Sequence, residues 1–510
     1  MSLLLNSLLR TKSVEQSIAE TDEPEHRLKK SLSALDLTVF GVGVIVGAGI
    51  FVYTGTVAAQ NSGPAISISF LVAGLACALA ALCYAEFAST LPVAGSAYTF
   101  SYATFGEFIA WLIGWDLVLE FTVGGAALAS SFSGYLQSLL ADTPFEVPTA
   151  LASSTHGVVN LPAMLIALLV TAVLARGIKL ASVVNQVVTG LKLAVVALVI
   201  VMGVSYVKVS NWVPFVPESK SVPAGDASFW SSPLISSLFG LEPAVYGWAG
   251  VMAGAAVVFF AFLGFDVVAT VAEETRNPQR DVPRGILFSL AIVTALYVAV
   301  SLVITGMQKY TDIDPEDSAP LATAFRAVGQ DWVGTAIAIG ATIGLTVVTM
   351  TLVMGQTRVG FAMARDGLLP RWLAKVHPEY RTPSRITLIS GAGVALLAGF
   401  VDFETLGHLV SIGTLFAFIL VAVGVLVLRR TRPDLQRGFR VPGVTVVAPL
   451  SVLLSFYLML NLVGETWMRF LAWMAIGIVV YFAYGRRHSR LGQRLAAEAR
   501  EAREAGTPAS

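Results

Sequence analysis

The stretch FGVGVIVGAGIF, residues 40–51, decides the fold of this chain, because four of its twelve residues are glycine and the other eight are apolar. A second apolar stretch, FFAFLGFD at residues 259–266, is interrupted by Gly264. In a lipid bilayer an unwound backbone leaves N–H and C=O groups unpaired, at several kcal/mol each, so it persists only where protein or a ligand satisfies them. The two interruptions therefore predict a ligand site near the middle of a membrane.

The composition is that of a membrane protein. The chain has 510 residues, of which 55% are hydrophobic and only 13% are charged, and its mean hydropathy is +0.75. Apolar segments of roughly 20 residues, each long enough to cross a ~30 Å hydrocarbon layer, recur along nearly the whole chain. We expect an all-α membrane protein with twelve transmembrane helices, at residues 35–59, 65–88, 106–138, 157–175, 180–205, 246–273, 284–306, 333–362, 385–401, 404–428, 446–463 and 467–485.

Other classes of site receive little support from the sequence. Cys77 and Cys83 lie in one apolar segment, where packing is a better explanation than a disulfide or a metal site. We expect no metal and no cofactor. The first thirty residues hold ten charged side chains, which excludes a secretory h-region there. The net charge of zero gives no reason to expect a nucleic-acid partner.

The distribution of basic residues predicts the orientation. With the N-terminus inside, 27 of the 33 lysines and arginines fall in cytoplasmic segments and five in outer loops, while Lys192 lies within a span. Because cytoplasmic loops of membrane proteins carry an excess of basic residues, both termini are predicted to be cytoplasmic, in a multi-pass protein of the plasma membrane.

The two glycine breaks predict an internal repeat. Spans 1–5 and 6–10 form two halves, each beginning with a broken helix, and an odd number of spans per half inverts one half relative to the other. This 5+5 inverted repeat with discontinuous helices 1 and 6 is typical of secondary transporters. The predicted organisation is a cytoplasmic segment 1–34, a core 35–428 made of repeats 35–205 and 246–428 around an outer loop 206–245, two additional helices in 429–485, and a cytoplasmic tail 486–510.

The breaks offer complementary chemistry to a zwitterion. At Gly47–Gly49 the restarting helix would point unpaired N–H groups and its positive dipole end at a carboxylate. The carbonyls released near Phe262 and Leu263 would accept hydrogen bonds from an ammonium group, and Phe262 and Phe265 could wall the substrate side chain. Close packing of small residues between helices is the alternative explanation of the glycines. The predicted substrate-binding residues are Ile45, Val46, Gly47, Ala48, Gly49, Ile50, Phe262, Leu263 and Phe265.

Lys192 lies at the centre of a predicted span, ~18 Å from either end at 1.5 Å per residue, too far for its side chain to reach water comfortably. An ammonium there is costly, so it should be neutral part of the time or donate to carbonyls and a carboxylate. Proton coupling is the favoured hypothesis, and a purely structural tether is the alternative.

Asp116 and Glu120 lie four residues apart on one face of the third span. An intramembrane carboxylate is a functional candidate, so Glu120 could gate proton flow, pair with Lys192 or receive a cationic substrate side chain. A structural hydrogen bond explains Asp116 equally well. Asp266, directly after the second break, is predicted to cap or tether the unwound segment.

Five stretches resemble the amino acid-polyamine-organocation superfamily, and within it the cationic amino acid transporter family in its bacterial twelve-span form. They are GVGVIVGAGIF (41–51), CYAEFASTLPVAGSAYTF (83–100), WDLVLEF (115–121), FFAFLGFDVVATVAEETRNPQRDVPRGI (259–286) and GQTRVGFAMARDGLLP (355–370). The resemblance implies a leucine-transporter-type fold, a substrate carboxylate at the Val46–Ile50 backbone and an amine at the carbonyls around Phe262 and Leu263. It also implies that Lys192 acts at the equivalent of a sodium site and that Glu120 helps in substrate or proton handling.

We therefore expect a proton-coupled importer of L-amino acids that works by alternating access, whose partners are the amino acid, protons and membrane lipids. Whether a small accessory transmembrane subunit joins it stays open, as does the choice between cationic and small neutral substrates. The alternatives are an amino acid exchanger without net proton flux and a transporter-like amino acid sensor. An enzyme is not expected, because HExxH, GxSxG, P-loop and Cys/His-cluster patterns are absent from the sequence.

Overall fold

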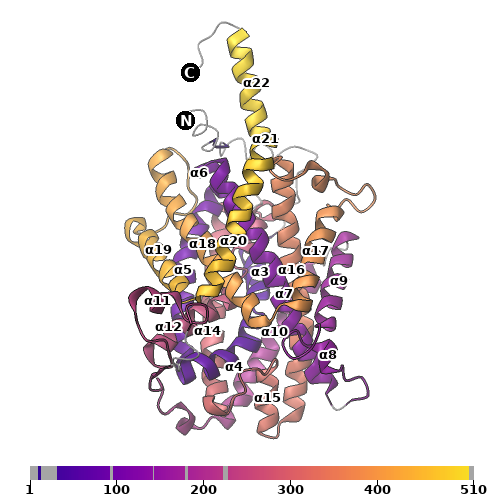
Figure 1. Cartoon of the computed structure of the whole chain (residues 1–510), viewed down its shortest axis with the longest axis vertical. Coiled ribbons are helices and arrows are strands. Elements are labelled where there is room, and N and C mark those ends of the chain that lie inside the picture. Colours follow the sequence, from indigo (N-terminus) through magenta and orange to yellow (C-terminus); the bar gives the residue numbers. More distant parts are fainter. Residues whose placement is uncertain are drawn as a thin grey trace.

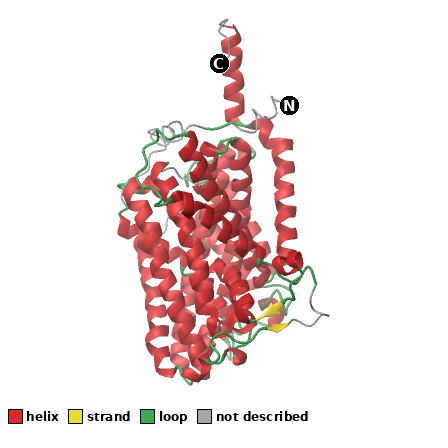
Figure 2. Ribbon diagram, turned by 90° about the vertical axis from the view of Figure 1, so that its left-hand side faces the viewer, coloured by secondary structure: helices red, strands yellow, loops and turns green. Residues whose placement is uncertain are grey.

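The structure, a computed structural model, describes residues 10–12, 32–91, 96–141, 143–177, 182–221 and 228–504. Helices make up most of this part of the chain and run mostly along one direction, with a small pair of strands at one end (Figures 1 and 2). Most of the predicted segment 1–34 lies outside the described residues, as does the end of the predicted tail.

The first half of the chain begins with a helix that breaks and restarts in short pieces. These pieces are α3 (Ala34–Ile45), the π-helix η1 (Gly49–Tyr53), α4 (Thr54–Val57), the π-helix η2 (Ala58–Ser62) and the 3₁₀ turn η3 (Gly63–Ala65). Gly63 has a φ of 59°, a left-handed conformation that glycine adopts without strain, and it separates these pieces from the next helix. The remaining helices of this half are α5 (Ile66–Thr90), α6 (Ser96–Thr104), α7 (Glu107–Leu140), α8 (Thr149–Ala152), α9 (Leu161–Ala175) and α10 (Ser182–Gly203).

The segment between the halves, predicted to be irregular, contains short elements. They are η4 (Val204–Tyr206), η5 (Val209–Trp212), β1 (Lys220–Ser221), α11 (Leu234–Phe239) and β2 (Ala244–Val245). The two strands pair antiparallel, with Lys220 opposite Val245. In Figure 2 this ribbon lies toward the end of the molecule opposite the C-terminal helix.

The second half also begins with a helix in pieces: α12 (Gly247–Val258), the 3₁₀ turn η6 (Phe259–Phe262), α13 (Val267–Thr270) and η7 (Ala272–Glu274). Helix α14 starts at Pro278, six residues before its predicted start, because a proline at the first helical turn needs no N–H partner. The other elements are α14 (Pro278–Met307), η8 (Tyr310–Asp312), α15 (Pro320–Ala327), α16 (Asp331–Arg365), η9 (Arg371–Ala374), α17 (Ser384–Phe400), α18 (Phe403–Thr431), α19 (Val444–Leu460), α20 (Gly464–Val480), η10 (Tyr481–Gly485), α21 (Arg486–His488) and α22 (Arg490–Glu504).

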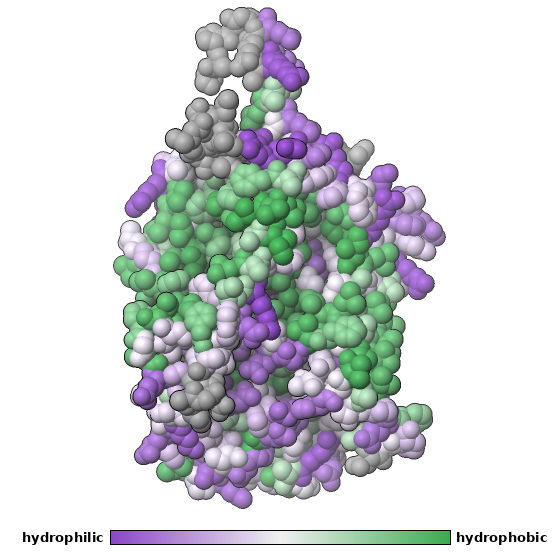
Figure 3. Space-filling model, viewed as in Figure 1, coloured by the Kyte–Doolittle hydropathy of each residue, from purple (hydrophilic) through white to green (hydrophobic). Residues whose placement is uncertain are grey.

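Eight helical stretches within the described residues are long and apolar enough to cross a membrane. Four shorter apolar helices accompany them: α3, α9, α17 and α19. On the face shown in Figure 3, hydrophobic residues cover much of the upper body and both flanks, while hydrophilic residues gather at the two ends and reach up the centre of the face. This distribution matches a body whose flanks face lipid and whose ends face water.

The described N-terminal residues and helix α22 lie at one end of the molecule, which we call the terminal face (Figure 1). The buried carboxylate of Glu107, the first residue of α7, joins them there. It accepts hydrogen bonds from the hydroxyls of Tyr102 and Tyr481, both at 3.0 Å, and from that of Ser489. Arg10 lies 3.8 Å away and also accepts the Glu107 N–H at its carbonyl oxygen. Arg10, among the first described residues, and Ser489, directly before α22, therefore both contact the Glu107 carboxylate.

Candidate functional site

The first break follows α3. The N–H of Val46 still donates to Val42, but the ψ of Val46 is 96°, which takes the chain out of helical geometry. Helical geometry resumes at Ala48 and continues into η1. All residues from Ile45 to Ile50 are buried. As at any helix ends, the last carbonyls of α3 and the first N–H groups after the break lack partners within their own helix.

The second break lies between η6 and α13. Leu263 leaves helical geometry with a ψ of 135°, and Gly264 has a φ of 104°, a conformation that residues with a Cβ rarely adopt. The turn is held by hydrogen bonds from Leu263 N–H to Phe260 and from Val267 N–H to Gly264, at 3.0 and 3.2 Å. The break thus coincides with the glycine that interrupts the apolar run.

The two breaks lie against each other. A Cβ built on Gly264 would lie 2.5 Å from a methyl group of Val44, and one on Gly49 would overlap Ala261. The hydroxyl of Tyr297, from the middle of α14, lies 2.8 Å from the Ile45 carbonyl oxygen and 2.7 Å from that of Ala261. Because a tyrosine carries one hydroxyl proton, it donates to one of these carbonyls at a time. One carbonyl of the pair is therefore left to accept a hydrogen bond from another donor.

Lys192 reaches the first break from α10. Its ammonium group donates to the carbonyl oxygens of Gly43 and Val46, the latter at 3.1 Å, and its side chain is 1% exposed. The C-terminal end of a helix carries partial negative charge, so these carbonyls stabilise a cation. Gly344 on α16 provides the room, since a Cβ there would lie 2.6 Å from the lysine Cδ. Lys192 therefore fastens α10 to the end of α3.

The carboxylates predicted near the site are buried on α7 and beside the second break. Asp116 and Glu120 are at most 1% exposed, and none of their four oxygens has a hydrogen-bond partner among the described residues. Thr414 lies beside Glu120, but its hydroxyl is donated to the Val410 carbonyl at 3.0 Å. Asp266 is also buried, at the start of α13.

The structure does not bring Lys192 and Glu120 into contact, because the ammonium is bonded to the carbonyls of α3. Of the three roles predicted for Glu120, a direct ion pair with Lys192 is therefore absent from the described structure. A buried carboxyl group without a partner is costly when charged, so it is suited to exchange a proton or to bind a ligand cation.

The phenylalanines of the second break pack in two aromatic clusters. The Phe262 ring lies 5.3 Å from Tyr297 and 6.5 Å from Phe70, both centroid to centroid. The Phe265 ring lies 5.0 Å from Phe418 and 5.7 Å from Tyr84. These contacts fix the backbone on both sides of Gly264. Phe262 and Leu263 contribute the carbonyls predicted to face an ammonium group.

Sequence reasoning missed Tyr297. It is a fully buried tyrosine in the middle of an apolar helix, and its hydroxyl needs a partner there. The need of a buried hydroxyl for a hydrogen-bond acceptor is a signal that the sequence contains, but the sequence does not show which backbone carbonyl accepts the bond. In the structure, Tyr297 joins the carbonyls of the two breaks.

A comparison with known proteins gives the family. A family model described as amino acid permease matches residues 32–482. A methylthioribose transporter and the branched-chain amino acid permease BcaP, both of Bacillus subtilis, are each 45% identical over 493 residues, which is 96% of this chain and 100% and 99% of theirs. A vacuolar cationic amino acid transporter 4 of Arabidopsis thaliana is 40% identical over 84% of this chain and 68% of its own length.

Proposed function

Because the chain belongs to the amino acid permease family, and is accordingly an integral membrane protein rather than an enzyme, we propose that it imports L-amino acids by alternating access and is driven by a proton gradient. The observation that carries this proposal is the contact between two broken helices, with Tyr297 between them and Lys192 bonded to the first. A secondary transporter needs a mid-membrane site that both halves of the molecule can close.

The proposed architecture has twelve spans. The pieces from α3 to η2 count as one span, and α5 as the next, with Gly63 between them. The others are α7, α9, α10, the α12–α13 pair, α14, α16, α17, α18, α19 and α20. Two halves of five spans would each begin with a broken helix, which supports the inverted 5+5 repeat. The order of long and shorter apolar helices fits this count.

At the proposed substrate site the carboxylate of an amino acid binds the N–H groups from Gly47 to Ile50, and its ammonium binds a carbonyl at the second break. Helix starts favour anions and released carbonyls favour cations, so a zwitterion satisfies both breaks at once. The Tyr297 hydroxyl donates to either the Ile45 or the Ala261 carbonyl at one time, so a hydrogen-bond donor on the substrate could bind the other carbonyl.

The proposed proton carrier is Lys192. When its side chain is charged, Lys192 holds the end of α3 to α10. When the side chain is neutral, its attraction to the C-terminal end of α3 is much weaker. A proton would therefore control whether α3, which carries the first break, is fastened to α10. Glu120 is the proposed second proton-handling group, and Asp116 and Asp266 are proposed to tether or gate the broken segments.

The proposed location is the plasma membrane, with the terminal face in the cytoplasm. The strong excess of basic residues on that side supports this orientation. Which amino acids are carried is left open by the relatives, whose names include a branched-chain amino acid, cationic amino acids and a sugar derivative.

The test uses the purified full chain. A thermal-shift screen of the amino acids and methylthioribose at two pH values identifies ligands, and uptake of a hit is then measured in liposomes with and without an inward proton gradient. We expect accumulation that rises with the gradient. Uptake only into amino acid-loaded liposomes, without response to the gradient, would show an exchanger, and binding without any uptake would show a sensor.

A further inference from the structure

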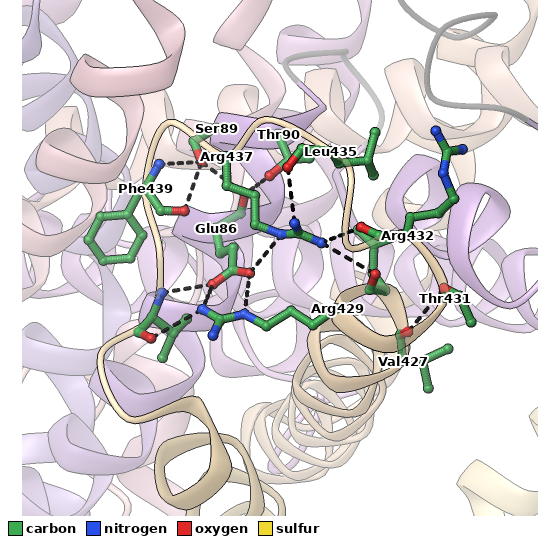
Figure 4. Close-up of polar contacts among 12 residues, drawn as sticks. Glu86, Ser89, Thr90, Val427, Arg429, Thr431, Arg432, Leu435, Arg437 and Phe439 are labelled. Carbon is green, nitrogen blue, oxygen red and sulfur yellow. Dashed lines mark hydrogen bonds and ion pairs between the residues drawn. The ribbon is translucent and has the colours of Figure 1, made fainter.

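The loop from Arg432 to Gly443, which joins α18 to α19 and which we call the α18–α19 loop, lies across the end of α5 at the terminal face (Figure 4). Its backbone bonds to α5 side chains at two points. The Val441 N–H donates to Glu86 Oε2 at 2.7 Å, and the Phe439 N–H donates to Ser89 Oγ at 3.0 Å. The loop is therefore bound to α5 in one register.

Glu86 is the centre of this attachment. Its side chain is 4% exposed, and Arg429, near the end of α18, donates to both of its oxygens, from Nε at 2.8 Å and from Nη2 at 2.5 Å. The Nε of Arg437 lies 3.3 Å from Glu86 Oε1. A forked guanidinium–carboxylate pair fixes direction as well as distance. Since the group is buried, removing its charge leaves the arginines without their counter-ion.

Arg437 links the carboxylate to the end of α18. Its Nη2 donates to the carbonyl oxygens of Arg432, at 2.9 Å, and Leu428, at 3.3 Å, which are at the C-terminus of that helix. A cation at a helix C-terminus satisfies carbonyls that lack partners within the helix. Glu86 thus holds the last turn of α18 through two arginines, one on the helix and one on the loop that follows.

Helix α18 and the α18–α19 loop also contact elements on both sides of the proposed motion. A Cβ on Gly438 would lie 2.8 Å from the Gln279 carbonyl in the first turn of α14, so the loop touches α14 as well as α5. In the middle of α18, a Cβ on Gly413 would lie 2.9 Å from Asp116 on α7. In the transport cycle that we propose, the two broken helices, α5 and α14 form the group that rocks, and α7, α9, α10 and α16 form the group against which it rocks.

We propose that Glu86 is a positioning residue that makes the terminal-face end of α18, together with the α18–α19 loop, move with α5 and α14 during transport. This inference rests on the proposed function. The ionic attachment to α5 lies at the end of α18, whereas α18 also packs extensively against α7, including at Gly413. Because α18 is packed against α7 and its end is bound to α5, the end of α18 would hinge relative to the rest of the helix as the rocking group moves.

The first test compares Glu86→Gln with Glu465→Gln in liposome uptake. Glu465 pairs with Arg469 at 2.6 Å on α20, and both side chains are at least 41% exposed. Glu465→Gln is therefore a control in which an exposed ion pair, rather than a buried one, is removed. For Glu86→Gln we expect Vmax to fall at least about tenfold, with KM and the amino acid-induced thermal shift unchanged. Glu86→Asp, which keeps the charge, should recover part of Vmax, and Glu465→Gln should match the wild type.

The second test measures the motion itself. Spin labels are placed at the exposed positions Gln436, in the loop, and Arg371, in η9 after α16, in a protein whose buried cysteines Cys77 and Cys83 are replaced by alanine. We expect the distance between the labels to change when substrate is added to the otherwise wild-type protein. In Glu86→Gln, adding substrate should leave the distance between the two labels unchanged or broaden its distribution.

Three results would overturn the inference. Glu86→Gln could transport and shift its label distance as the wild type does. Glu86→Gln could show a raised KM, a lowered Vmax and a lowered thermal stability together, with no recovery in Glu86→Asp. That result would indicate a merely structural role. The label distance could also stay constant in an actively transporting wild type. A wild type that takes up no ligand at all would instead contradict the proposed function, so the two failures are distinguishable.

Discussion

The ammonium of Lys192 on α10 lies 3.1 Å from the carbonyl oxygen of Val46, the C-cap residue of α3. This one contact joins an intact helix to a broken one in the interior of the molecule. Because the ammonium also bonds to Gly43, it occupies two carbonyls of the last turn. The attachment of the first break to α10 therefore depends on the protonation of a single side chain.

Replacing Lys192 by methionine keeps the length of the side chain but removes its proton and its bonds to α3. We expect gradient-driven accumulation to fall at least about tenfold, to the level reached without a gradient, while amino acid binding by thermal shift persists. Lys309→Met, at an exposed lysine outside the helices, is the control and should transport normally. Undiminished stimulation of Lys192→Met by the gradient would place proton carriage elsewhere.

Tyr297→Phe removes only the hydroxyl that lies between the two breaks. Loss of one buried hydrogen bond costs about 1 kcal/mol, so the thermal midpoint in detergent should fall slightly. Substrate affinity should also weaken, because the Ile45 and Ala261 carbonyls would no longer be held together. Tyr457→Phe, at a tyrosine that is 37% exposed, provides the matched control. Equal affinities for the two variants would show that the bridge is irrelevant to binding.

Gly264→Ala tests the second break. The substitution forces a Cβ into a φ of 104° and to within 2.5 Å of Val44, and a residue held in such a conformation is destabilised by about 1–3 kcal/mol. We expect lower thermal stability and lost transport. Gly190→Ala on α10 is the matched change, since its Cβ would meet nothing within 4 Å, and in a helix alanine is favoured over glycine by about 1 kcal/mol. That variant should be at least as stable as the wild type.

Two buried glutamates on α7 should respond differently when each is replaced by glutamine. Glu107 accepts three hydroxyl hydrogen bonds, so Glu107→Gln should lose stability by about 1–3 kcal/mol. The oxygens of Glu120 accept none within the described residues, so Glu120→Gln should be as stable as the wild type while the pH dependence of its uptake changes. Thermal melts and uptake across pH measure both. A Glu120→Gln protein that unfolds earlier than Glu107→Gln would contradict this assignment.

The sequence was sufficient to predict the broken helices, because the signal is local. Gly47, Gly49 and Gly264 interrupt apolar runs, and the structure has Val46 and Leu263 outside helical geometry beside them. Helix bounds were predicted to within a few residues in most cases. Short helices such as α6 and α15 were not predicted, because they are too short to produce a clear apolar period. The twelve-span count and the inverted repeat stay predictions.

Contacts between distant residues could not be predicted. Tyr297 reaches Ile45 across 252 positions, and Arg429 reaches Glu86 across 343. Either side chain could be explained locally as a polar residue near a helix middle or end. Lys192 is conspicuous in the sequence as a charge inside an apolar span, but its carbonyl partners are set by the fold, which brings α10 to the end of α3.

The contacts of Arg10 and Ser489 with Glu107 have a practical consequence. A purification tag or fluorescent reporter placed close to Arg10 or to Ser489 would disturb contacts with the same Glu107 carboxylate. Labels for microscopy are better fused after Glu504 through a long spacer, since α22 projects away from the helical body (Figure 1).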